Sequence, residues 1–256
     1  MELFKSGNPA LSDKTFESGR FATELEALDY ERMTVRGAAG KFGAMMLALI
    51  IAAGWAWIRI PQSPNVMLWM GGSAIGGFIL AMIIIFKPML ASKLALGYAL
   101  LEGIFLGTLS ALVNAAFATR YPGIAGQAVL LTLGVAIAMF GLYYFRILKA
   151  TPIFTKVIIM ATMGIALFYV INMVLRLFGS GMPFLHDSSP LSIGISLFVV
   201  GIAALNFILD FDQIERGAEA GAPKQMEWYG AFGLMLTIVW LYLEILKLLM
   251  KLANRR

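Results

Sequence analysis

The sequence contains no cysteine and a single histidine, His186, and these absences exclude several kinds of chemistry. Without thiols the chain can form neither disulfides nor thiolate metal sites, and it has no cysteine nucleophile. One histidine cannot build a His-rich metal site, and no Ser–His or Cys–His pair is available for catalysis. We therefore expect neither enzyme activity nor a bound cofactor.

Charged residues are also scarce. They make up 14% of the chain, against about 25% in soluble domains. Hydrophobic residues make up 60%, and the mean hydropathy is +0.81. The composition predicts an integral membrane protein that is surrounded by the lipid bilayer. The net charge is +5, but the basic residues lie between hydrophobic runs instead of forming one stripe, so nucleic acid is not an expected partner.

Hydrophobic runs separated by short polar connections predict seven transmembrane helices and an all-α fold. The expected segments are Phe42–Ile60, Val66–Phe86, Leu94–Ala118, Ile124–Leu148, Phe154–Phe178, Leu191–Phe211 and Tyr229–Met250. We divide the chain into a polar tail over residues 1–41, a seven-helix domain over residues 42–252 and a short end over residues 253–256. The tail shows no apolar core of a signal peptide.

The distribution of Lys and Arg predicts the orientation in the membrane. With the N-terminus in the cytoplasm, the tail and the cytoplasmic connections hold 13 basic residues and the opposite connections hold three. The basic residues near the C-terminus do not fit this orientation, because they would then lie outside the cytoplasm; they are Lys251, Arg255 and Arg256. The seventh helix either crosses the membrane or re-enters and returns, and we favour a crossing.

Acidic residues are rare enough in the hydrophobic part to suggest function. Between Phe42 and Phe211 there are three, Glu102, Asp187 and Asp210, and Asp212 follows directly. Asp187 is expected in a loop. Glu102 lies nine residues into the third segment, so it must be protonated, paired across helices or exposed to water. Asp210 and Asp212 are two residues apart and do not share a helix face, so at most one points into the bundle.

Glu244 lies inside the last hydrophobic segment. From Tyr229 to Leu243 there are 15 uncharged residues, fewer than the ~20 that a spanning helix needs, so Glu244 must be within the membrane. A carboxylate there costs roughly 2.5–3.5 kcal/mol and by default marks a functional site. Pairing with Lys247 at a frayed helix end is an equally good interpretation. Asp210, Glu102 and Glu244 at successive depths would suit a path for cations or protons.

Several short sequences resemble the Bax inhibitor-1 (TMBIM) family. DFDQIE is followed about thirty residues later by WLYLEILKLL, and YALLEGIFLGTLS also fits the family. NPALSDKTF, at Asn8–Phe16, is similar to the tail of a bacterial subgroup. The resemblance covers essentially the whole chain, and the order and spacing of the sequences make it fairly specific.

The resemblance implies a seven-helix bundle with helix seven in the middle and a pH-sensitive Ca²⁺ leak channel. The family's proton-sensing pair on helices six and seven would be Asp210 and Glu244, which are also the expected Ca²⁺ contacts. Glu244 stands where the family usually has Asp. A basic residue that partners the pair in some relatives would fall near Lys87.

Helix geometry sets a condition on this pair. With a straight helix from Trp228, Asp210 and Glu244 differ in depth by more than two turns. They can meet only if helix six continues through Ile214 or beyond, or if helix seven begins outside the membrane. If they meet, they share a proton, and loss of that proton separates the helices. Flux should then rise with cytoplasmic pH.

The alternative is a non-conducting membrane regulator that binds a membrane protease or another quality-control partner, a role that some bacterial relatives resemble. Such a protein would use the polar tail and the helix surfaces. A cysteine-free, compact seven-helix chain without targeting segments fits a bacterial inner membrane with the N-terminus in the cytoplasm.

Overall fold

The computed structural model describes residues 31–179 and 187–255. Most of the predicted polar tail, including Asn8–Phe16, and also His186 lie outside these ranges. The described chain forms α3 (Val35–Arg59), α4 (Val66–Phe86), the short 3₁₀ helix η2 (Pro88–Leu90), α5 (Ala91–Ala116), α6 (Ile124–Tyr144), α7 (Pro152–Leu177), α8 (Pro190–Glu219) and α9 (Met226–Arg255). Seven of these helices, with η2 continuing into α5, are long and apolar enough to cross a membrane, which confirms the all-α prediction.

Three helices extend further than their hydrophobic runs. Helix α3 begins at Val35, because the Thr34 side chain caps it by accepting a hydrogen bond from the backbone N–H of Gly37. Helix α8 continues past Phe211 to Glu219, and α9 runs on to Arg255. Charged residues end a hydrophobic run but do not end a helix, since Glu, Lys and Arg are good helix formers.

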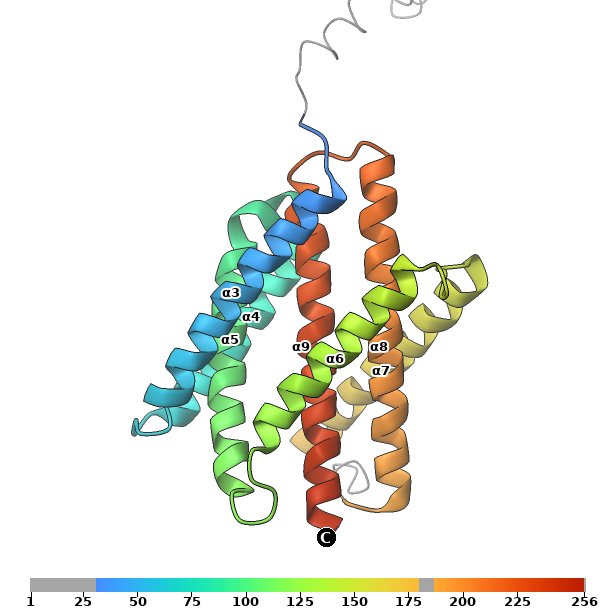
Figure 1. The fold of residues 1–256 in the computed structure, drawn as a ribbon. Helices are drawn as coiled ribbons and strands as arrows, with labels where there is room; N and C mark the ends of the chain where they lie inside the picture. Colours follow the sequence, from blue (N-terminus) through green and yellow to red (C-terminus); the bar gives the residue numbers. More distant parts are fainter. Residues whose placement is uncertain (1–30, 180–186, 256) are drawn as a thin grey trace, which may run out of the picture.

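Helix α9 lies at the centre of the bundle (Figure 1). Sixteen of its residues are buried, against four in α3 and four in α4. It packs against α3, α5, α6 and α8. The central position expected of helix seven is therefore confirmed.

Helix α9 is also continuous and ends at the side of the bundle opposite its turn with α8 (Figure 1). A re-entrant helix would return to the side on which it began. The structure thus agrees with a seventh helix that crosses, in spite of the basic residues Lys251 and Arg255 near its end.

Two glycines let α3 and α5 approach closely. A side chain added at Gly103 would collide with the backbone oxygen of Leu49, and one at Gly107 with the backbone oxygen of Ala53. Small residues at such crossings are the usual means of helix packing in membranes. The contact holds α3 and α5 together, and both helices pack against α9.

Candidate functional site

Asp210 points from α8 toward the central helix. The Thr237 hydroxyl of α9 donates a hydrogen bond of 2.6 Å to Asp210 Oδ2. The carboxylate also borders a small cavity of about 80 Å³. Polar lining comes from Gln213 and Tyr229, and the remaining lining residues are Ile85, Ile214, Gly230, Phe232, Gly233 and Leu236. The cavity brings together α4, α8 and α9 in the half of the bundle that contains the α8–α9 turn.

Asp212 faces elsewhere. Arg216, one turn further along α8, places its Nε 2.7 Å from Asp212 Oδ2. The two acids of this segment therefore occupy different faces of α8, as their spacing predicts. Of Asp210 and Asp212, only Asp210 points into the bundle, toward α9.

Glu244 is 2% exposed and has several donors. The Tyr169 hydroxyl of α7 lies 3.0 and 3.1 Å from its two oxygens, and the Trp240 indole N–H donates to Oε1 at 3.3 Å. Lys247 forms an ion pair of 2.6 Å with the same oxygen. Lys247 Nζ also lies 4.6 Å from the centre of the Tyr169 ring. The carboxylate is thus tied to α7 and neutralised from its own helix.

Asp210 and Glu244 are not brought together. Thr237, the partner of Asp210, lies seven residues before Glu244 on α9, which is ~10.5 Å along the helix. Helix α8 does continue beyond Ile214, yet the antiparallel hairpin places Asp210 opposite Gly233 and Thr237 instead of Glu244. In this structure the two acids lie in series along α9, each with its own partners.

Glu102 is half-buried on α5 and faces α4. A side chain at Gly77 would come within 2.9 Å of the Glu102 carboxylate, so the glycine provides its space. No other described residue gives Glu102 a hydrogen bond or ion pair. We expected Glu102 to be protonated, paired across helices or exposed to water. Among the described residues it is not paired across helices.

Lys87 ends α4 and is exposed. Within the described ranges it forms no ion pair, either with Asp210 or with Glu244. It lies two residues after Ile85, which lines the Asp210 cavity. Its position is near the cavity, without contact between charges.

Lysines follow Glu244 toward the end of α9. Lys251 is 9% exposed, and its amine donates to Ser196 Oγ at 2.7 Å and to the backbone oxygen of Ser192 at 3.3 Å. With Lys247, it makes this half of α9 electropositive around one carboxylate.

The chain before α3 is clamped to the α8–α9 turn. Glu227, 1% exposed, accepts hydrogen bonds from the backbone N–H and the hydroxyl of Thr34 at 3.1 and 3.0 Å. The Met33 N–H donates to the Ala222 oxygen at 2.7 Å. Because the carboxylate lies at the N-terminus of α3, it also interacts favourably with the helix dipole.

An exposed ion pair adds to this clamp. Lys224 Nζ lies 2.7 Å from a Glu31 carboxylate oxygen. The hydrogen bond from Lys224 lowers the pKa of Glu31 and raises that of Lys224. A second ion pair, between Arg146 and Glu215, joins the α6–α7 connection to α8. The hydrogen bond to Glu215 raises the pKa of Arg146.

Sequence reasoning did not find Tyr169, Thr237 or Glu227. Thr237 is a polar residue in the last hydrophobic segment, and its position before Glu244 on one helix was a usable signal. Tyr169 reaches Glu244 from another helix, which spacing along the chain does not show. Glu227 lies at a helix start and resembles any solvated acid of a turn.

No closed metal site is formed by the described part of the chain, in which no three His, Asp or Glu residues cluster. Ca²⁺ prefers six to eight oxygen ligands, whereas Asp210 and Glu244 each offer one carboxylate. Neither carboxylate alone therefore completes the coordination of a Ca²⁺ ion.

The sequence matches the family model described as Bax inhibitor 1 like over residues 8–254. No curated protein and no solved structure matches the chain. The family match covers the seven long helices, with α9 up to residue 254, and it includes Asp210 and Glu244.

Proposed function

The chain belongs to the Bax inhibitor 1 like family, and from that premise we propose that it is a pH-sensitive leak channel for Ca²⁺ and other cations. The observation that carries the proposal is the half-buried Asp210 carboxylate at a cavity between α4, α8 and α9. Acids facing the interior of a membrane bundle typically belong to ion or proton pathways.

The proposed path passes Asp210 first and Glu244 second. Asp210 and the Thr237 hydroxyl offer oxygen ligands to a cation that enters through the small cavity. Glu244 lies about two turns further along α9, and its charge is cancelled by Lys247. In this proposal the arrangement is the closed state of the channel, and the first site, Asp210, borders the small cavity.

Opening requires the second site to be released. Lys247 repels a cation and holds Glu244, while Tyr169 ties the same carboxylate to α7. Movement of α9 relative to α7 would break the contacts of Tyr169 with Glu244 and Lys247. The Glu244–Lys247 pair lies within α9, so its release also requires the Lys247 side chain to turn away from Glu244. The pair proposed from the family resemblance thus acts as two acids in series.

The pH dependence follows from the charge of Asp210. An ionised carboxylate attracts a cation, and a protonated one does not. Flux should therefore increase as pH rises on the side of the α8–α9 turn. We place this side in the cytoplasm, on the basis of the Lys and Arg bias, in a bacterial inner membrane.

The test is Ca²⁺ flux into proteoliposomes with Asp210→Asn, matched by Asp212→Asn as the control. Asp210→Asn should lower flux by about tenfold or more, because a unit charge 4 Å from a cation contributes ~4 kcal/mol at an effective dielectric of 20. Asp212→Asn should leave flux unchanged, since Asp212 pairs with Arg216 on another face. Equal flux in both variants would refute the assignment.

A second candidate function is a non-conducting regulator that binds a membrane protease or quality-control factor. The clamp of Thr34 on Glu227 favours it, because a partner that pulls on the N-terminal segment would act directly on the α8–α9 turn. Such a protein shows no flux above empty liposomes when it is folded, and it loses its partner when residues 1–30 are removed. A channel keeps its flux in that deletion.

A further inference from the structure

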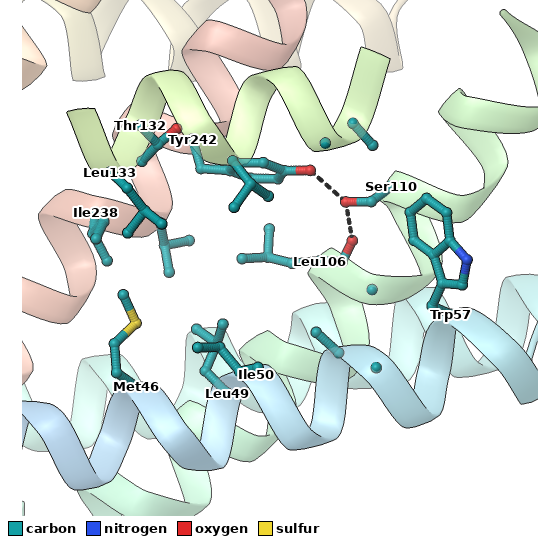
Figure 2. A pocket seen from close by; sticks show the side chains of 17 residues that line it. Met46, Leu49, Ile50, Trp57, Leu106, Ser110, Thr132, Leu133, Ile238 and Tyr242 are labelled. Carbon is teal, nitrogen blue, oxygen red and sulfur yellow. Dashed lines mark hydrogen bonds between the residues drawn. The ribbon is translucent and has the colours of Figure 1, made fainter. Parts of the chain in front are cut away.

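A second, larger cavity lies on the other side of α9 from Asp210. Its volume is about 440 Å³, within the range of ligand sites. Helices α3, α5, α6 and α9 line it, and Figure 2 shows Met46 and Ile50 of α3 facing Leu133 of α6 and Ile238 of α9 across the space. Every lining residue belongs to a membrane-spanning helix.

The cavity opens to the side, where lipid surrounds the protein. Ile50 and Val129 at its rim are 58% and 45% exposed, whereas Leu106 and Thr132 inside are 6% and 3% exposed. Two rim glycines, Gly54 on α3 and Gly126 on α6, have open space where a side chain would stand.

The hydroxyl groups of the lining side chains are all hydrogen-bonded within the protein, and the remaining polar group among them is the Trp57 indole N–H near Arg59. The Ser110 and Tyr242 hydroxyls bond each other at 2.5 Å, and Ser110 also donates to the Leu106 oxygen (Figure 2). The Thr132 hydroxyl donates to the Ala128 oxygen at 2.7 Å. Away from Trp57, a polar ligand or an ion would lose its hydration here without replacement. A hydrocarbon chain loses nothing and gains dispersion contacts with the walls.

Positive charge lies at one end of the cavity. Arg59 is the last residue of α3, two residues after the lining Trp57, and Arg120 lies in the connection just before the lining Ala125. Both arginines are exposed, and within the described ranges neither forms an ion pair. Arginine at the membrane surface is well suited to bind a phosphate.

We propose that the cavity binds an acyl chain of an anionic phospholipid whose phosphate contacts Arg59 and Arg120. The lipid enters from the leaflet opposite the α8–α9 turn. Its chain packs on Ile238 and Tyr242, which lie between Thr237 and Glu244 on α9. The bound chain thus supports α9 from the side opposite the acids, and this binding is independent of the proposed conduction.

The test counts bound lipid by native mass spectrometry on the full chain, titrated with phosphatidylglycerol after delipidation. The double variant Gly54→Leu/Gly126→Leu fills the cavity. Its matched control is Gly43→Leu/Gly134→Leu, on the same two helices, also with open space around each glycine but outside the cavity. Excluding two or more methylene groups should lower affinity by about tenfold or more, and the control should bind as wild type does.

Equal binding by the filled variant and the control would overturn the proposal. The single variant Gly126→Leu guards against misfolding of the double variant, and it should bind with intermediate affinity. Arg59→Gln/Arg120→Gln should abolish the preference for phosphatidylglycerol over phosphatidylcholine. A preference retained in that variant would overturn the position of the phosphate.

Discussion

At the scale of single residues, three carboxylates of this bundle, those of Asp210, Glu244 and Glu227, differ in the partners that surround them. Asp210 has one hydroxyl partner and a cavity beside it, Glu244 has an ion pair and three further contacts, and Glu227 serves the start of α3. The same side-chain chemistry therefore supports different roles. A cation can approach Asp210 without displacing a charged residue, and it cannot approach Glu244 in this way.

Replacing Lys247 tests the proposed closed state. Lys247→Met should raise Ca²⁺ flux several-fold, because it removes both the repelling charge and one tie on Glu244. Tyr169 and Trp240 still donate to the carboxylate in this variant. Lys149→Met, in an exposed connection, serves as the control and should conduct as wild type. Flux that stays unchanged or falls in Lys247→Met would contradict the role given to this lysine.

Removing Glu227 tests the clamp. Glu227→Ala leaves the Thr34 N–H and hydroxyl without their buried acceptor, which should lower the free energy of unfolding by about 1–3 kcal/mol. The control Glu219→Ala changes an exposed acid at the end of α8 and should have little effect. Thermal unfolding in detergent measures both. A loss of equal size in the two variants would argue against a specific contact.

At the scale of helices, hydrophobic runs predicted all seven crossings but not where the helices end. Helix α8 continues to Glu219 and α9 to Arg255 because polar residues remain helical beyond the membrane. The sequence also allowed Asp210 to meet Glu244 if helix six continued through Ile214. The register of the α8–α9 hairpin excludes that contact in this structure, and hairpin register depends on tertiary packing that periodicity does not encode.

Helix packing provides a test between α3 and α5. Gly107→Ala places a methyl group against the backbone of Ala53, so it should cost about 1–3 kcal/mol through overpacking. Gly97→Ala, on the same helix, meets only the Leu80 side chain at an ordinary distance of 3.5 Å and should be neutral or slightly stabilising. The difference in Tm between these two variants measures the effect. Equal Tm values would show that α3 can shift freely.

At the scale of the whole molecule, the two proposed functions use different parts of the chain. Asp210 contacts the central α9 from α8, and Glu244 lies on α9 itself, whereas the clamp joins the segment before α3 to the α8–α9 turn. A truncation that ends before Glu31 preserves the contacts of Glu31, Met33 and Thr34 with the turn. Deletion of residues 1–30 should therefore leave the bundle folded, with an unchanged Tm. A large fall in Tm would show that the removed residues support the bundle directly.

The most direct test of the central claim is Ca²⁺ flux into proteoliposomes from mildly acidic to mildly alkaline pH, for wild type and Asp210→Asn. The account predicts that wild-type flux rises with pH on the side of the α8–α9 turn and that Asp210→Asn gives low flux without this rise. Wild-type flux that is independent of pH, or folded protein with no flux above empty liposomes, would contradict it.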